Sequence, residues 1–351
     1  MRRGKRILAL LLSVLMGLSD HAWVNAVGIQ TEPSGQGCQN SYGELLEQVT
    51  DLYEKKQLMP DTGQPDHSFA TGVLLVGSNE PDFDRFGAEL VIEASPGLYA
   101  LSYPTPADAK AAYGTYSQMD GILFVEPDTV IGTQEEGSEA VAATEISEEN
   151  ENSVEADTQT SADALHGQTP ACIAVVDTGI DVTMEKAQPY LTGYNREGIL
   201  AKLRQFFGGE PDTEGFVSEA EVRDENGHGS QVTGLIADAL AGDGIGGDQA
   251  EILPVKVAGA DGRCTVLQLY LGIERAIALQ SDLINVSMGA FATTESAVLT
   301  KAADDAAKAG ITMVVSAGNN GSDVASYAPA NIPSVITAGS IDRNSQASDF
   351  S

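Results

Sequence analysis

The sequence predicts an α/β protein, in which a parallel sheet with helices on both faces follows a small α+β domain. Two patterns support this prediction. Beyond Pro170, short apolar segments alternate with helical patterns, whereas residues 72–130 contain short strands that alternate less regularly with helices. A polar and acidic segment over residues 134–167 separates the two patterns. The composition therefore predicts a domain boundary at the end of this segment.

The first 26 residues have the pattern of a secretory signal peptide. A basic cluster precedes an apolar stretch from Ile7 to Leu18, and small residues surround a cleavage position near Ala26. The stretch is too short to cross a bilayer comfortably, although an uncleaved membrane anchor is the alternative. We expect a secreted or cell-surface protein with no membrane attachment after cleavage.

Residues 27–133 predict a small domain of mixed strands and helices. Apolar residues at helical spacing indicate a helix over 42–56. Strands are expected at 73–76, 89–93, 98–103 and 122–127, with helices at 82–86 and 105–119. The resulting order β-α-β-β-α-β suggests a ferredoxin-like unit.

Charge and cysteine usage exclude several classes of function. The chain has 19 basic and 51 acidic residues and a formal net charge of −32, and nine of the acidic residues lie between Glu135 and Asp157. We interpret this segment as a disordered linker. Nucleic acid and anionic lipid both require a positive surface, so neither is an expected partner. Three cysteines at irregular spacing predict neither a disulfide framework nor a metal site.

Residues 168–351 carry the parallel-sheet pattern. Apolar strands are expected at 172–176, 252–257, 283–287, 312–317 and 334–339, and helices at 228–240, 266–279 and 295–309. Such a sheet places its functional site at the carboxyl ends of its strands. The segment between Asp177 and His228 is long and predicts a surface insertion.

Three polar residues stand where this architecture would place a site. Asp177 ends the first strand, His228 lies between two glycines at a helix start, and Asn319 follows the strand 312–317. The Asp177 carboxylate could accept a hydrogen bond, the small glycines leave His228 open to a partner, and the Asn319 amide could act as a donor. Taken singly, each also fits an ordinary strand end or glycine turn.

Four stretches in this order resemble the subtilisin-like serine proteases, the subtilase family: "DTGID", "GHGSQVTG", residues 250–289, and "ASYAPANIPSVITAGSIDRNSQASDFS". The resemblance covers residues 171–351. It extends by element order and position to residues 72–130, which are similar to the family's inhibitory propeptide. The expected fold of the larger domain is therefore subtilisin-like.

The resemblance implies a role for each of the three polar residues. Asp177 would orient His228, and His228 would act as general base toward a serine hydroxyl and then as general acid toward the leaving amine. Asn319 would donate to the oxyanion. A polypeptide substrate would bind as an added strand. The residues implied for substrate binding are Gly262, Arg263, Cys264, Ser287, Met288, Gly289, Ser316, Ala317 and Gly318.

Departures from the family pattern concern both the substrate edge and the nucleophile. Arg263 and Cys264 replace the usual glycine and small residues, and we interpret Cys264 as a packing residue. Gln231 and Ser230 replace a histidine and a threonine that have no catalytic role. The family's serine turn does not occur up to Ser351, which itself lacks the expected surroundings. We expect the serine beyond Ser351, so that residues 1–351 alone would be inactive.

The resemblance carries further expectations about maturation and cofactors. The chain's own propeptide would act as an intramolecular inhibitor, and maturation would cut near residues 158–170. No cofactor is required for the chemistry, although the resemblance allows structural calcium. An inactive relative that binds peptides is the alternative function.

Two other motifs suggest different functions but lack the structural context that those functions need. Two "DTG" motifs suggest an aspartic protease, but the copy at 61–63 lacks a preceding strand. Glycines 242, 244 and 247 match a dinucleotide motif but follow a helix, so they predict a loop.

Overall fold

The computed structural model describes Leu45, Gln48, Val49, Leu52, Tyr53 and residues 69–133, 170–191, 222–291, 295–341 and 346–351. The signal peptide, the acidic segment and most of the insertion expected between Asp177 and His228 lie outside these residues, as does the "DTG" motif at 61–63. Of the helix expected over 42–56, the five described residues are helical. We call residues 69–133 the N-terminal domain and residues 170–351 the C-terminal domain.

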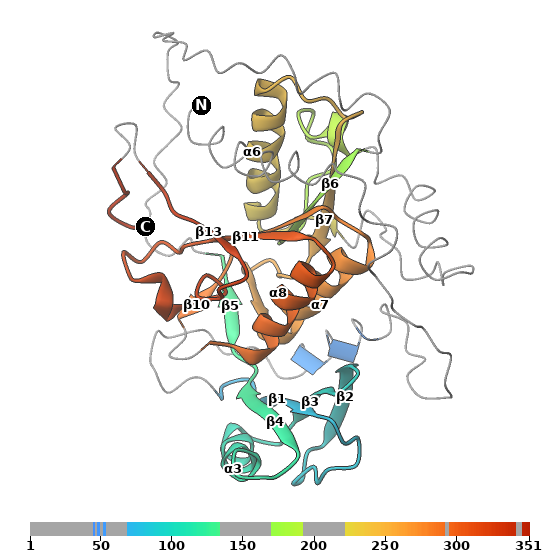
Figure 1. Ribbon diagram of the computed structural model, residues 1–351, viewed down its shortest axis with the longest axis vertical. Coiled ribbons are helices and arrows are strands. Elements are labelled where there is room, and N and C mark those ends of the chain that lie inside the picture. Colours follow the sequence, from blue (N-terminus) through green and yellow to red (C-terminus); the bar gives the residue numbers. More distant parts are fainter. Residues whose placement is uncertain are drawn as a thin grey trace, which may run out of the picture.

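The N-terminal domain is an antiparallel sheet with one helix on one of its faces (Figure 1). Its elements are β1 (Val73–Ser78), β2 (Leu90–Ser95), β3 (Leu98–Ser102), α3 (Pro106–Tyr116) and β4 (Ile122–Pro127). The strand order is β2-β3-β1-β4. Helix α3 begins as expected, because the Thr105 side chain accepts a hydrogen bond from Asp108 N and proline occupies the first turn.

The prediction of a helix at residues 82–86 is wrong, and so is the β-α-β-β-α-β order that depends on it. This segment is irregular and ends in a turn at Phe86 and Gly87. Its backbone groups bond to side chains instead of to each other. Phe86 N donates to Asp84 Oδ1, while the hydroxyls of Tyr116 and Tyr103 donate to the carbonyls of Asp84 and Arg85. These bonds compete with helix formation.

The C-terminal domain contains a five-stranded parallel sheet in the order β13-β11-β9-β6-β7. Its strands are β6 (Ala171–Asp177), β7 (Ala250–Lys256), β9 (Leu283–Val286), β11 (Thr312–Ser316) and β13 (Ile336–Ala338). Its helices are α6 (His228–Gly242), α7 (Val266–Ala278) and α8 (Ala297–Lys308). The five strands and three helices expected here are confirmed, with only their ends shifted.

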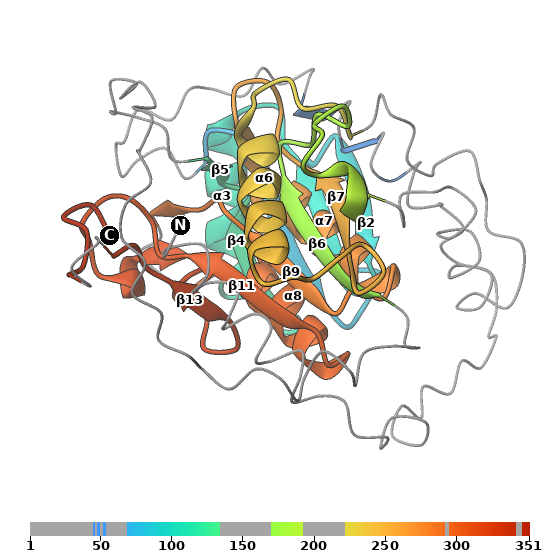
Figure 2. The same cartoon turned by 90° about the horizontal axis from the view of Figure 1, so that it is seen from above.

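Helices cover both faces of this sheet, as expected (Figure 2). On β6, Ile173 and Val175 share a buried cluster with residues of α6. The intervening Ala174 and Val176 share another with residues of α7 and α8. Alternate side chains of a strand point to opposite faces, so β6 is apolar up to its last residue, Asp177, because it is buried on both faces.

Shorter elements complete the C-terminal domain. The strand pair β10 (Ala290–Phe291) and β12 (Tyr327–Ala328) is antiparallel, and 3₁₀ helices occupy Gln188–Tyr190 and Val324–Ser326. The glycine-rich run after α6 forms a loop, as the sequence indicates.

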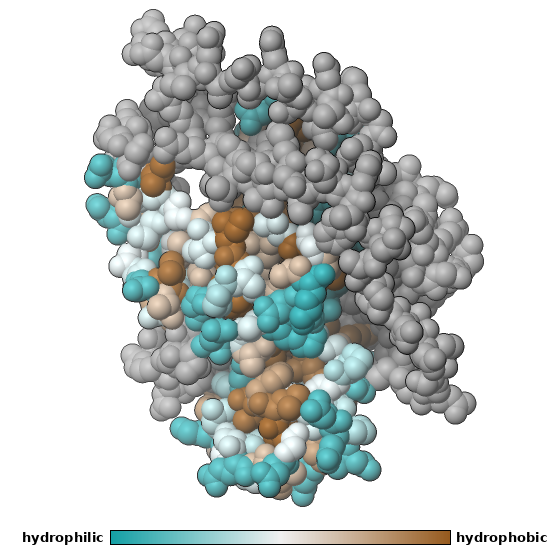
Figure 3. Space-filling view, in the orientation of Figure 1, coloured by the Kyte–Doolittle hydropathy of each residue, from teal (hydrophilic) through white to brown (hydrophobic). Residues whose placement is uncertain are grey.

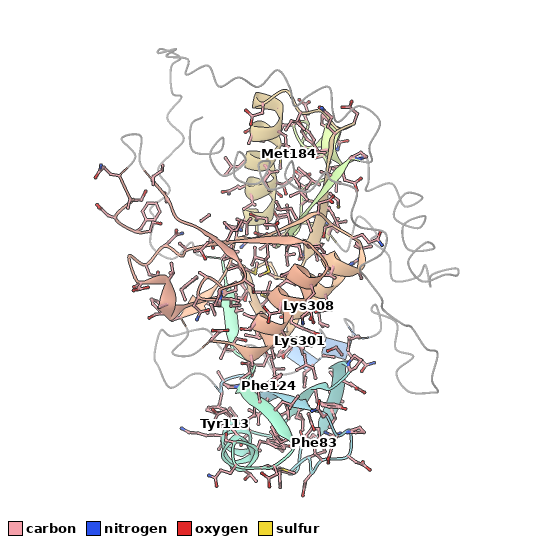
Figure 4. The ribbon with its side chains drawn as sticks, in the orientation of Figure 1. Phe83, Tyr113, Phe124, Met184, Lys301 and Lys308 are labelled. Atoms are coloured by element: carbon pink, nitrogen blue, oxygen red, sulfur yellow. The ribbon has the colours of Figure 1, made fainter. Side chains whose placement is uncertain are left out.

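The N-terminal domain packs against α7 and α8 through one face of its sheet. Phe124 packs against the large cluster that includes residues of both helices, whereas Phe83 and Tyr113 lie with α3 on the far side (Figure 4). Figure 3 shows an apolar area on the surface of this domain at the level of β4, below a hydrophilic surface at the level of α8. Leu123 of β4 is among the exposed apolar residues.

A short strand after β4 joins the two domains. Strand β5 (Val130–Gly132) pairs antiparallel with β8 (Arg263–Thr265). Neither strand was expected from the sequence, because each is only three residues long and forms through pairing with a distant segment.

Candidate active site

Asp177 and His228 meet at the carboxyl end of β6. The distance from Asp177 Oδ1 to His228 Nδ1 is 2.8 Å, and the same oxygen accepts a hydrogen bond from Thr178 N at 2.7 Å. The Asp177 side chain is fully buried, whereas that of His228 is 17% exposed. Because the carboxylate oxygen accepts at Nδ1, the neutral imidazole carries its proton there and its lone pair on Nε2. This arrangement suits a general base.

Two glycines allow His228 to occupy this position at the start of α6. Gly227 has a φ of 106°, which places it in the left-handed region that favours glycine. Gly229 allows close packing, because a Cβ atom there would lie 2.2 Å from the carbonyl oxygen of Gly179. The helix therefore starts in contact with the turn that follows Asp177.

Asn319 belongs to the same edge of the sheet. It follows β11, and Gly318 before it has a φ of 98°. Strands β6 and β11 are parallel and both flank β9, so their carboxyl ends lie on one side of the sheet. The structure thus brings Asn319 to the edge that carries Asp177.

Two of the three segments expected to bind substrate, 262–264 and 287–289, lie on either side of residues 130–133. Gly132 and Gly289 exchange two backbone hydrogen bonds, of 3.3 and 3.1 Å, and Thr133 N donates to Gly262 O at 2.9 Å. On the other edge, β8 contains Arg263 and Cys264. The end of the N-terminal domain therefore lies as an extended strand between both edges.

Cys264 is a packing residue in this edge. It is fully buried, and its Sγ atom lies 3.5 Å from Met288 Sδ. Burial, followed by the nearby Asp128 and Asp177 carboxylates, raises the pKa of its thiol. A thiol in this state is unreactive, which agrees with the packing role expected from the sequence.

Tyr327 contacts two of the glycines on the expected substrate-binding segments, and sequence reasoning missed it. A Cβ atom on Gly289 would lie 2.3 Å from its ring, and one on Gly318 would lie 3.4 Å from it. The ring is buried, and burial raises the pKa of its hydroxyl. No sequence signal marks this tyrosine, because its position depends on contacts between segments far apart in the chain.

Several serine hydroxyls around the site bond to other groups. Ser230 Oγ donates to Asp224 Oδ2 at 2.6 Å, and Ser287 Oγ accepts from Asn285 Nδ2 at 2.9 Å. Ser351 Oγ accepts a hydrogen bond from Ser340 N at 2.7 Å. These contacts do not pair any of the three hydroxyls with His228.

The cysteine spacing predicts no metal site. The hydropathy beyond the first 26 residues predicts no membrane span. Within the described part of the chain, no group of three or more His, Cys, Asp and Glu side chains could hold a metal ion, so no calcium ligands are assigned there. The described helices also include none that is long and apolar enough to span a membrane.

Comparison with known proteins identifies the family. Residues 169–351 match the subtilase family, peptidase S8. Subtilisin BL of Lederbergia lenta is 34% identical over 181 residues, which are 51% of this chain and 58% of that protein. Subtilisin-like protease 2 of Pseudogymnoascus destructans is 31% identical over 179 residues, which are 51% of this chain and 39% of that protein.

The comparison with solved structures gives a distant match. The epidermin leader peptide processing serine protease of Staphylococcus aureus is 18% identical, with a TM-score of 0.47, and the match covers 80% of this chain and 71% of that one.

This chain spans about 40 to 60% of the length of the two subtilisin relatives described above. Since the family match extends over more than half of the chain, the protein belongs to the subtilase family of serine proteases.

Proposed function

We propose that residues 1–351 belong to the precursor of a secreted serine endopeptidase that hydrolyses extended polypeptides. The contact of 2.8 Å between Asp177 and His228 carries the proposal. Asp177 orients the imidazole and supports its charged form, and His228 removes the proton from a serine hydroxyl and returns it to the leaving amine. Asn319 donates a hydrogen bond to the oxyanion. Structural calcium has no part in these steps.

The serine nucleophile is proposed to lie beyond Ser351. The hydroxyls of Ser230, Ser287 and Ser351 bond to groups other than His228, which supports this assignment. Residues 1–351 would then contribute the base, its orienting carboxylate and the oxyanion donor, but no nucleophile.

The expected substrate edges are proposed to hold a substrate as an added strand. The pairing of residues 130–133 with Gly289 and β8 supports this mode, because a bound peptide would make the same backbone hydrogen bonds. In the same proposal, residues 27–133 are the propeptide, and their last residues inhibit the enzyme by occupying the substrate position.

This placement also bears on maturation. Thr133 is the last described residue of the strand that lies between the two proposed substrate edges. We therefore propose a first cut within about three residues after Thr133, with the cut expected at 158–170 as a later trimming step. N-terminal sequencing of the maturing protein tests this order, and a single cut at 158–170 would contradict it.

The test of the function uses the chain extended through its natural coding sequence beyond Ser351. We expect this protein to hydrolyse an internally quenched peptide of residues 128–139. His228→Ala should lower kcat by a factor of about 10⁶, as removal of the catalytic histidine does in subtilisin. Gln231→Ala, an exposed substitution on the same helix, is the matched control and should retain activity.

The same experiment distinguishes the alternative function. An extended protein that binds the peptide with high affinity but does not hydrolyse it would be a peptide-binding relative. The mass of the protein recovered from the culture medium tests secretion, because removal of residues 1–26 predicts a defined loss.

A further inference from the structure

Asp224 accepts hydrogen bonds from two segments that meet at the proposed catalytic pair. Its Oδ1 atom accepts from Thr178 Oγ1 at 2.9 Å and from Gly227 N at 2.7 Å. Its Oδ2 atom accepts from the backbone N of Ser230 at 2.8 Å and from the hydroxyl of Ser230 at 2.6 Å. Gly227 and Ser230 lie on either side of His228. One carboxylate therefore joins the end of β6 to the start of α6.

Thr178 completes this connection. Its backbone N–H donates to Asp177 Oδ1 at 2.7 Å, the oxygen that also faces His228. Its hydroxyl donates to Asp224 and accepts a hydrogen bond from Gly229 N at 2.8 Å. The Thr178 side chain is fully buried. The backbone N–H of Thr178 thus contacts Asp177, and its hydroxyl contacts Asp224 and the start of α6.

Asp224 is ionised wherever a histidine base would work. Burial, the largest single influence, opposes ionisation, but the hydrogen bonds from Ser230, Gly227 and Thr178 together lower its pKa to about 2. A charged acceptor makes stronger hydrogen bonds than a neutral one. The connection between β6 and α6 therefore persists throughout the neutral range.

We propose that Asp224 and Thr178 are positioning residues that hold Asp177 and His228 at hydrogen-bonding distance. The inference rests on the proposed function of that pair. The competing explanation is that Asp224 only caps α6, whose N-cap residue Gly227 has no side chain to do so. A cap alone would affect the stability of the helix but not the geometry of the pair.

The test observes the Asp177–His228 hydrogen bond directly in the chain of 351 residues. Nuclear magnetic resonance of protein labelled with ¹⁵N at its four histidines reports the ring nitrogens and the Nδ1 proton. His228→Ala identifies the relevant signals. Thr178→Val keeps the charge of Asp224 but removes the connecting hydroxyl. We expect it to move the Nδ1 proton resonance upfield and to speed its exchange with water roughly tenfold.

Further variants separate positioning from charge and from general loosening. Asp224→Asn should have the same effect as Thr178→Val, and Thr178→Ser should restore both signals. Thr233→Val is the matched control, because Thr233 is also buried, lies on α6, and its hydroxyl has no hydrogen-bond partner among the described residues. It should leave the His228 signals unchanged.

Three results would overturn the proposal. The first is a fall in melting temperature for Thr178→Val and Asp224→Asn with unchanged His228 signals, since this is the behaviour of a cap. The second is an equal change in Thr233→Val. The third is the absence of a hydrogen-bonded Nδ1 proton in the unsubstituted chain. None of these results depends on a serine nucleophile, so failure here is distinct from failure of the peptidase assay.

Discussion

At the scale of single residues, Gly229 sets how closely α6 approaches the end of β6. A Cβ atom there would lie 2.2 Å from Gly179 O and 3.0 Å from Gly179 N. Both are backbone atoms, so the two segments would have to move apart. We expect Gly229→Ala to lower the free energy of unfolding by about 1–3 kcal/mol, the usual cost of overpacking. Urea denaturation measures this change.

Gly114 provides the matched control for that substitution. It also lies within a helix, α3, but a Cβ atom there would have no neighbour within 4 Å. Gly114→Ala should raise stability by about 0.5–1 kcal/mol, because alanine favours the helix more than glycine does. A similar fall in the free energy of unfolding for both variants would mean that the close contact with Gly179 is not what makes alanine unfavourable at position 229.

The residues of the site differ in how far the sequence predicts them. Asp177 and His228 were expected to meet because the motifs around them resemble those of the subtilase family; taken singly, each also fits an ordinary strand end or glycine turn. The roles of Asp224 and Thr178 were not expected. Both are polar residues close to turns, and their roles depend on a hydrogen bond between residues 46 positions apart, which no local sequence pattern shows.

At the scale of secondary structure elements, two carboxylates of the N-terminal domain cap two helices of the C-terminal domain. Glu126 accepts hydrogen bonds from Ser296 Oγ at 2.8 Å and Ala297 N at 2.9 Å, at the start of α8. Asp128 accepts from Leu267 N at 2.9 Å, at the start of α7, and from the hydroxyl of Tyr53. Carboxylates are favourable at helix N-termini because of the helix dipole.

The burial of Asp128 beside the start of α7 makes stability depend on pH. Burial raises the pKa of Asp128 to about 7, although hydrogen bonds from Leu267, Thr265 and Val266 oppose the rise. Since this pKa is above the unfolded value, the contribution of Asp128 is fully present below about pH 4 and is lost as pH rises through 7. Between pH 5 and 8 we expect a loss on the order of 2 kcal/mol from this group.

Asp128→Asn isolates this contribution, because the asparagine does not titrate. The free energy of unfolding of the parent should fall from pH 5 to pH 8 by more than that of the variant, as measured by urea denaturation at each pH. Equal pH dependence in the two proteins would show that Asp128 ionises without cost in the folded state.

The sequence predicted helices and strands correctly where burial follows a regular pattern. It failed where side chains, instead of other backbone groups, form the hydrogen bonds of the backbone. The strands of the parallel sheet are apolar on both faces, so their positions follow from the sequence. Residues 82–86 failed, because Phe86 N donates to the side chain of Asp84 instead of to the carbonyl of Asp82, as a helix would require. Strands β5 and β8 were missed, because each has only three residues and is a strand by pairing with the other, which is far away in the sequence.

At the scale of the whole molecule, the contacts between the domains do not require an intact chain. The two domains are joined by the pairing of β5 with β8, by the two carboxylate caps, and by a hydrogen bond of 2.9 Å from Tyr270 Oη to Ser95 Oγ. All of these contacts lie outside residues 134–167. A cut within that segment should therefore leave the two parts associated.

The same contacts predict that the association weakens as pH rises. Burial raises the pKa of Glu126 as well as that of Asp128, so separation of the domains releases protons that the complex holds. With a specific protease site inserted after residue 137, the cut protein should elute as one complex at pH 5.5. Its dissociation constant should rise by roughly 30-fold at pH 8, which corresponds to about 2 kcal/mol.

The double variant Glu126→Gln, Asp128→Asn separates this mechanism from general repulsion between acidic domains. Both substitutions keep hydrogen-bond acceptors for the helix starts but remove the titrating protons, so the affinity of the cut parts should change little between pH 5.5 and pH 8. Repulsion alone would give the variant almost the same pH dependence as the parent, because the chain has a formal net charge of −32 and the variant differs by only two charges. Size-exclusion chromatography over a dilution series measures both affinities, and parallel pH profiles would assign the effect to overall charge instead of to the two caps.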